Sequence, residues 1–216
     1  MTIRNIIRRA LCMLLPLAGL TVCTSCTESD DSVEEYVDWQ KRNTEYFSQI
    51  HSTAQQAISA GSKKWKLIPT FSKTVGGNLA ATDYVVVEVL EEGMGAGCPL
   101  YTDTTRVHYS CSILPSTSYP EGHIVDKSFN GSTLNTATDV PLKSAFNTCV
   151  DGWTTAVMKM HIGDRWRVYV PYNLGYGTTN RTNDYKDIVV PAYSTLIFDL
   201  TLAAYYHPGK PVPDWK

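Results

Sequence analysis

Cys149-Val150-Asp151-Gly152-Trp153 opens the stretch of sequence that decides the fold, which runs as far as Leu200. After the turn, apolar residues recur at intervals of three and four, which predicts a short helix with one buried face. That face would hold Trp153, Ala156, Val157 and Met160. Alternating residues predict a strand over residues 165–170, and a second strand over residues 194–200 closes the stretch.

The loop between these two strands contains Leu174-Gly175-Tyr176-Gly177. If the helix packs across a sheet made of the two strands, Trp153, Tyr176 and Phe198 converge. The result is a small apolar pocket with few polar groups. Such a pocket suits the binding of a ligand better than a bond-breaking reaction.

The composition is that of a globular protein and carries no signature of a metal, cofactor or nucleic-acid site. Hydrophobic residues make up 43% and charged residues 19% of the 216, and the formal net charge of -2 comes with no basic stripe. The five histidines lack paired ligand spacing. Neither a Gly-x-Ser-x-Gly motif nor a matched carboxylate pair is present. An enzyme built from this chain would work without a cofactor, a metal or a nucleophile.

The first residues predict a secretory signal that is not part of the fold. Arginines precede an apolar run over residues 10–22, which is too short for a comfortable transmembrane helix. Small residues then precede Cys26, a pattern typical of bacterial lipoproteins, in which the cysteine becomes the lipidated N-terminus. Cys23 follows the bulky Val22 and fits this pattern less well. A plain cleavable signal is the third alternative.

An acidic run over residues 27–31 follows the predicted anchor. It resembles the signal that sends some Gram-negative lipoproteins to the outer face of the outer membrane, and a solvated acidic tether is the other interpretation. We therefore expect an outer-membrane lipoprotein of the cell envelope that contacts the membrane through Cys26. Its domain would face either the cell surface or the periplasm.

An amphipathic helix is predicted over residues 32–60. Ser32 and Glu35 form a capping box at its start, and Gly61 is a natural residue just past its end. Its apolar stripe is rich in aromatic residues, among them Trp39 and Phe47. The stripe is expected to pack on its own domain, with dimerisation as the alternative, so a monomer or weak dimer is predicted.

From residue 83 the residue pattern becomes typical of β-strands, and strands are predicted over residues 84–90, 105–113 and 124–129. The fold class is α+β: a bent antiparallel sheet wrapped around one short helix, preceded by a helical extension. The predicted divisions are a lipoprotein signal (1–25), an acidic tether with the helical extension (26–82), the α+β domain (83–206) and a proline-rich tail (207–216) in which regular structure ends.

After Cys26 the chain has three further cysteines, and an odd number in an oxidising compartment leaves at least one free thiol. Cys98 and Cys111 could form a disulfide if they lie on adjacent strands. Cys149 lies in an apolar run, which favours a buried small side chain over a nucleophile.

Eight short motifs follow one another along the chain: Val107-His108-Tyr109, Val125-Asp126-Lys127-Ser128, Val150-Asp151-Gly152-Trp153, Met160-His161-Ile162-Gly163-Asp164, Val170-Pro171, Leu174-Gly175-Tyr176-Gly177, Val190-Pro191 and the closing strand 194–200. In their order and approximate spacing, from about residue 83 to 204, the chain resembles the FKBP-type peptidyl-prolyl cis–trans isomerases. Each motif alone is weak, and their joint order carries the resemblance. The family fold, a bent sheet around one short helix, agrees with the prediction from the residues.

The resemblance implies a role for each matching position. Trp153 would be the floor of a proline pocket, with Tyr109, Val150 and Phe198 as its walls. Tyr176 would offer its hydroxyl to a substrate carbonyl, and Asp126 would be the polar group at the edge. Cys149 stands where the family places a backbone-contacting residue, and Val190 would also border the substrate.

Two positions depart from the family pattern, because Val125 and Val140 replace expected aromatic residues. The loop over residues 178–187 is also longer and more polar than usual. These changes would widen one wall of the pocket. The expected function is therefore an isomerase that acts on proline-containing polypeptides and assists exported proteins to fold, with a weakly catalytic peptide-binding module as the alternative.

Each site residue also has an ordinary structural interpretation. The aromatic residues Trp153, Tyr109 and Phe198 could be plain core residues. Asp126 could cap a turn and Tyr176 could anchor a loop. The order of these residues along the chain favours a site, because an unrelated hydrophobic core would not be expected to contain the same residues in the same order.

Overall fold

The computed structural model describes residues 34–73, 78–185 and 187–215, and Glu34–Lys216 make up one compact unit. The helices are α1 (Trp39–Ser59) and α2 (Asp151–Val157), with 3-10 turns η1 (Ala81–Asp83), η2 (Phe146–Thr148) and η3 (Tyr172–Leu174). The strands are β1 (Trp65–Pro69), β2 (Tyr84–Glu91), β3 (Thr104–Ile113), β4 (His123–Lys127), β5 (Leu142–Ala145), β6 (Arg165–Val170), β7 (Arg181–Thr182), β8 (Ile188–Val190) and β9 (Leu196–Tyr206). No helix within these residues is both long and apolar enough to cross a membrane.

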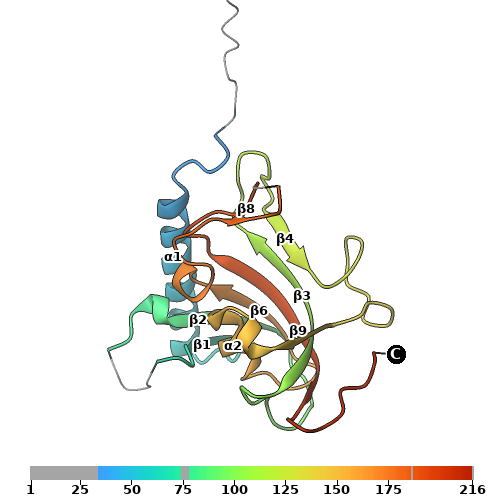
Figure 1. The fold of residues 1–216 in the computed structure, drawn as a ribbon. Helices are drawn as coiled ribbons and strands as arrows, with labels where there is room; N and C mark the ends of the chain where they lie inside the picture. Colours follow the sequence, from blue (N-terminus) through green and yellow to red (C-terminus); the bar gives the residue numbers. More distant parts are fainter. Residues whose placement is uncertain (1–33, 74–77, 186, 216) are drawn as a thin grey trace, which may run out of the picture. The chain divides into compact units, whose positions relative to one another are not determined.

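One antiparallel sheet has the strand order β1-β2-β6-β9-β3-β4, and β5 also pairs with β3. The long strands β3 and β9 curve around α2 (Figure 1). Strands β7 and β8 form a separate small hairpin. The fold is thus the predicted α+β class, a bent antiparallel sheet around one short helix with an N-terminal helix in addition.

The inner face of the sheet, which packs on α2, follows from the period of two in the strands. On β2, Val85 and Val87 belong to the main core, whereas Val86 between them belongs to a second cluster on the other side. Six of the seven residues of α2 are buried. Gly152 permits this close packing, because a Cβ there would lie 2.2 Å from Val170 Cγ1 on β6.

The outer face of the sheet is packed against α1. Phe47 and Ala54 of the helix form a buried cluster with Val86 of β2 and Tyr169 of β6. The aromatic stripe therefore packs on its own chain, as the favoured prediction had it. Gly61, with a φ of +86°, ends the helix, and Ser62 N–H donates to Ala57 O at 2.9 Å, which satisfies a carbonyl of the last turn.

The start of α1 differs from the prediction, because the helix begins at Trp39 and not at residue 32. The predicted capping residue Glu35 instead accepts hydrogen bonds from Ser116 and from both the N–H (3.1 Å) and the hydroxyl (2.6 Å) of Ser118. These bonds, that from Ser116 most of all, hold the pKa of Glu35 below its ordinary value. The carboxylate thus ties the chain to a distant loop and does not cap the helix.

Two polar side chains of α1 fix the segment that leads into β9. Trp39 Nε1 donates to the Ser194 hydroxyl at 2.9 Å. Asn43, which is buried, accepts from Thr195 N–H through Oδ1 at 2.7 Å. Because Phe198 lies just beyond on β9, α1 helps to position an inner-face residue from the opposite side of the sheet.

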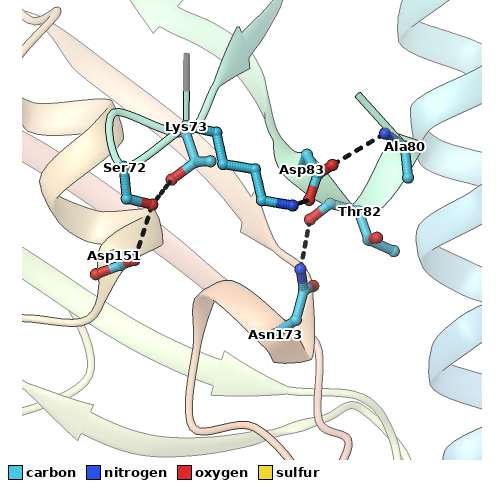
Figure 2. A network of polar contacts seen from close by, with 8 residues as sticks. Ser72, Lys73, Ala80, Thr82, Asp83, Asp151 and Asn173 are labelled. Atoms are coloured by element: carbon cyan, nitrogen blue, oxygen red, sulfur yellow. Dashed lines mark hydrogen bonds and ion pairs between the residues drawn. The ribbon is translucent and has the colours of Figure 1, made fainter. Parts of the chain in front are cut away.

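The predicted boundary at residue 83 is not a break in packing. Strand β1 pairs with β2, and the segment between them connects to the elements that follow (Figure 2). Ser72 Oγ donates to Asp151 at the start of α2 at 3.2 Å, and Asn173 of η3 donates to Thr82 O at 2.9 Å. Lys73 forms an ion pair with Asp83. Residues 65–73 and 78–83 therefore brace the same elements that carry Trp153 and Tyr176.

The tail after residue 206 has no regular structure, as predicted, but it packs back on β3. Arg106 donates to Pro213 O at 2.8 Å, and the Trp215 ring lies edge-on to His108 with centroids 6.2 Å apart. The three cysteines of the described residues, Cys98, Cys111 and Cys149, are free thiols. The disulfide considered for Cys98 and Cys111 is therefore absent. The predicted signal, Cys26 and the acidic run lie outside the described residues.

Candidate functional site

The floor of the site is an aromatic cluster on the inner face of the sheet. Trp153 of α2 is 4% exposed, and its ring meets Tyr109 of β3 at 5.1 Å and Phe198 of β9 at 5.4 Å between centroids. Both pairs are edge-to-face, with interplanar angles of 89° and 81°, an arrangement that aromatic quadrupoles favour. Three rings from three elements thus form one rigid apolar surface.

Two adjoining hollows open above this floor. The first, of about 190 Å³, is lined by Tyr109, Asp126, Leu142, Thr148, Cys149, Val150, Trp153, Tyr176, Arg181 and Phe198. The second, of about 180 Å³, is lined by Cys111, Val125, Asp126, Tyr176, Arg181, Thr182, Val189, Val190 and Phe198. Because the two share Asp126, Tyr176, Arg181 and Phe198, they form one continuous groove.

The carboxylate at the edge of the groove is held by defined hydrogen bonds. Tyr109 donates its hydroxyl to Asp126 Oδ2 at 2.7 Å, and Lys127 N–H donates to Oδ1 at 2.8 Å. Burial first, and the neighbouring carboxylate second, raise the pKa of Tyr109 well above its ordinary value. The phenol therefore stays protonated at physiological pH and remains a hydrogen-bond donor to Asp126.

Tyr176 reaches the groove from the loop after η3. Gly177 N–H donates to Tyr172 O at 2.8 Å, which fixes the turn that carries the ring. Burial raises the pKa of Tyr176, so its hydroxyl is also protonated. Within the described residues this hydroxyl has no hydrogen-bond partner, and the ring lines both hollows. It is a donor free to bind a carbonyl of a ligand.

The family model for the FKBP-type peptidyl-prolyl cis-trans isomerases matches residues 98–203, which include the whole aromatic floor. The chain carries an FKBP-type domain. This agrees with the resemblance of the sequence motifs and with the observed fold.

Several relatives of the FKBP type align with part of the chain. A macrophage infectivity potentiator of Trypanosoma cruzi is 29% identical over 58% of this chain and 55% of its own length. An FKBP-type 22 kDa peptidyl-prolyl cis-trans isomerase of Escherichia coli is 29% identical over 53% of this chain and 46% of its own length. The chain therefore spans about half the length of these relatives.

The solved structures show the same fold. A peptidyl-prolyl cis-trans isomerase from Pseudomonas syringae aligns with a TM-score of 0.50 and 19% identity. The alignment covers 77% of this chain and 95% of that chain.

The FKBP-type domain brings together most of the residues predicted for the site. Tyr109, Asp126, Cys149, Val150, Trp153, Tyr176 and Phe198 line the first hollow, and Val125 and Val190 line the second. Val140 is the exception, since it is 57% exposed and borders neither hollow. Leu142, two residues later, lines the first hollow instead. Strand β5 begins at Leu142, which pairs with Val107 of β3.

The main lining residue that the sequence did not indicate is Arg181. It lies on the β7 hairpin, inside the loop that is longer than is usual for the family, and its guanidinium stands 4.9 Å from the centre of the Tyr176 ring. A two-residue strand in a polar segment has no periodicity to predict it.

The chemistry that this groove can support is restricted. Burial raises the pKa of Cys149, so its thiol stays protonated and is a poor nucleophile. In the part of the chain that the structure describes, no cluster of three or more His, Cys, Asp or Glu side chains is placed to hold a metal ion. What the groove offers is an apolar floor for a ring and one free hydroxyl donor near it.

Proposed function

We propose that this protein is a peptidyl-prolyl cis–trans isomerase of the cell envelope that assists exported proteins to fold. The observation that carries the proposal is the groove of the FKBP-type domain, with the Trp153 floor and the free hydroxyl of Tyr176 above it. Proline-containing polypeptides are its proposed partners, because a pyrrolidine ring is small and apolar enough to pack on the indole.

The reaction requires no acid, base or nucleophile. Rotation about a peptide C–N bond faces a barrier of about 18–20 kcal/mol because resonance makes that bond partly double. The planar resonance form is dipolar and is stabilised by water. A groove with an apolar floor disfavours this form relative to the twisted transition state, and each ~1.4 kcal/mol removed from the barrier increases the rate tenfold.

Each part of the groove has a role in this mechanism. The proline ring rests on Trp153 between Tyr109 and Phe198, while the Tyr176 hydroxyl holds a carbonyl next to it. Asp126, fixed by Tyr109, adds a negative charge at the edge of the groove. One side of the amide is thereby held still while the other side rotates. Uncatalysed X–Pro isomerisation takes roughly tens to hundreds of seconds, long enough to delay folding.

A proline-limited refolding assay tests the activity. The protein without residues 1–26, at micromolar concentration, should accelerate the slow refolding phase of a protein whose folding waits for an X–Pro bond. Circular dichroism of the same sample establishes that the domain is folded. A folded sample without any rate gain would exclude the isomerase.

The second candidate function is a peptide-binding module that uses the same groove. Val125 favours it, because it lines the second hollow where the family resemblance leads us to expect an aromatic residue, and a smaller side chain would leave more space at this wall. A folded protein that binds proline-containing peptides with micromolar affinity but does not accelerate refolding would support this alternative.

The location in the envelope is proposed from the sequence. Cys26 follows small residues and a short apolar run, so we propose that it carries a diacylglyceryl group that anchors the protein in the outer membrane. Mass spectrometry of the membrane-extracted protein should find the lipid on an N-terminal Cys26. An unmodified chain, or one that starts at another residue, would contradict the anchor. Protease treatment of intact cells distinguishes the surface from the periplasmic face.

A further inference from the structure

Arg181 is a positive charge at the junction of the two hollows. It belongs to β7 and pairs with Val190 of β8, so the small hairpin determines where it lies. Its guanidinium lies 4.9 Å from the centre of the Tyr176 ring, within the range of a cation–π contact. The contact keeps the arginine beside the ring whose hydroxyl would bind the substrate.

The charge of Arg181 has no carboxylate partner within the described residues, since none lies within 4.0 Å of it. Asp126 is the only acidic residue that lines either hollow. Its two oxygens already accept hydrogen bonds from Tyr109 and from Lys127 N–H. Of the two charged groups that line the hollows, Arg181 is therefore the one whose side chain has no hydrogen-bonded or ionic partner among the described residues.

The surroundings of Arg181 limit the polar contacts that a substrate residue next to the proline can make. The second hollow is otherwise lined mainly by apolar side chains, including Val125, Val189 and Val190. If proline lies on Trp153 in the first hollow, an adjacent residue of an extended chain can reach the second, because the two hollows share four lining residues. In the second hollow, the guanidinium of Arg181 is the charged donor available to this substrate residue.

We propose that Arg181 makes this groove selective for prolines that have an acidic residue next to them. The inference rests on the proposed isomerase function and names its substrate class. An aspartate or glutamate side chain beside the proline pairs with Arg181 while the ring lies on Trp153. Because Arg181 is exposed, this pair contributes modestly, as ion pairs at the surface do.

The test compares peptides that differ only in glutamate against glutamine. One pair has the change immediately before proline, and a second pair has it immediately after. With residues 34–216, which form one compact unit, kcat/KM should favour glutamate roughly two- to fivefold at one of the two positions. The preference should approach unity in ~1 M salt, where charges are screened within about 3 Å.

Arg181→Gln should remove the preference, and Arg181→Lys should retain part of it. Arg165→Gln is the matched control, because Arg165 lies on the outer side of β6, pairs with Glu91 and borders neither hollow. That variant removes the same charge and should keep the preference. Equal rates for all four peptides, a preference for glutamine at both positions, or a glutamate preference that survives Arg181→Gln would overturn the proposal.

The design separates this proposal from the proposed function. If none of the four peptides is isomerised, the isomerase function fails. Peptide affinities measured by calorimetry then decide the role of Arg181 without turnover. A two- to fivefold tighter binding of the glutamate peptide that is lost in Arg181→Gln supports the selectivity, and equal affinities exclude it.

Discussion

The two faces of the sheet bury aromatic residues in different ways. On the inner face, Trp153 is 4% exposed and still borders a hollow of about 190 Å³. On the outer face, Phe47 is 3% exposed and packs with Ala54 of the same helix and Val86 of the sheet. Equal burial therefore does not imply an equal role. An aromatic residue becomes part of a site only where the element that covers the sheet leaves space above the ring.

The length of the covering helix accounts for this difference. Helix α1 has 21 residues and runs along the outer face, whereas α2 has 7 and ends after Val157. The part of the inner face that α2 leaves uncovered is bordered by loops and by β4, and there the groove opens. Truncation of the outer-face aromatic residue should therefore change stability alone, and truncation of the aromatic residue that borders the hollow should also change activity.

The largest effect should come from truncating the buried aromatic residue of each face. Phe47→Ala and Trp153→Ala should each cost about 3–5 kcal/mol of unfolding free energy, because both remove a large buried side chain. Under conditions in which each variant is folded, Phe47→Ala should keep the wild-type kcat/KM and Trp153→Ala should lose it. Urea unfolding and the refolding assay, run on the same samples, measure the two quantities.

The two variants have the same expected cost in unfolding free energy, so a difference between their kcat/KM values reports the different roles of the two residues. If Phe47→Ala lowers kcat/KM as much as Trp153→Ala does, the sheet transmits changes between its faces, and the separation of roles is wrong. If Trp153→Ala keeps full activity in its folded state, Trp153 is a core residue and not the floor of the site.

A smaller effect is expected at Asn43, the buried amide that connects α1 to β9. Asn43→Ala leaves Thr195 N–H without its acceptor at 2.7 Å, which should cost about 1–3 kcal/mol. Thr44→Ala is the control on the same helix, since Thr44 is exposed and donates only to Gln40 O of the preceding turn. That variant should stay within about 0.5 kcal/mol of wild type in urea unfolding. Equal stability of both variants would show that the connection is unimportant.

The regular elements that carry the floor could be predicted from the sequence, because their signals are local. The alternation over residues 165–170 reproduces β6, and that over 105–113 reproduces all but the first residue of β3. Trp153, Tyr109 and Phe198 lie on such elements. Their convergence follows once helix and strands are assigned and the helix is packed across the sheet.

Features that depend on distant partners could not be predicted in this way. Glu35 fits a capping box locally, but Ser116 and Ser118 bind its carboxylate from a loop more than 80 residues away. The register of β5 is likewise set by pairing with β3, which puts Leu142 and not Val140 at the hollow. Arg181 lies in a polar loop whose short hairpin has no sequence period.

The smallest predicted effect concerns the rim of the groove. Tyr176→Phe removes one hydroxyl that has no partner in the described residues and leaves the ring under Arg181 in place. Stability in urea should hardly change. If the hydroxyl binds the substrate carbonyl, kcat/KM should fall roughly two- to tenfold, the equivalent of one net hydrogen bond of about 0.5–1.5 kcal/mol.

Tyr185→Phe is the matched control for this variant, because Tyr185 lies in the long loop that follows (residues 178–187), is 87% exposed and borders neither hollow. It should leave both stability and kcat/KM unchanged. A decrease in Tyr176→Phe alone assigns the hydroxyl to the bound substrate. If Tyr176→Phe keeps both full stability and full rate, the hydroxyl is not the carbonyl donor. Catalysis then depends on other groups that line the first hollow, among them the aromatic floor and Asp126.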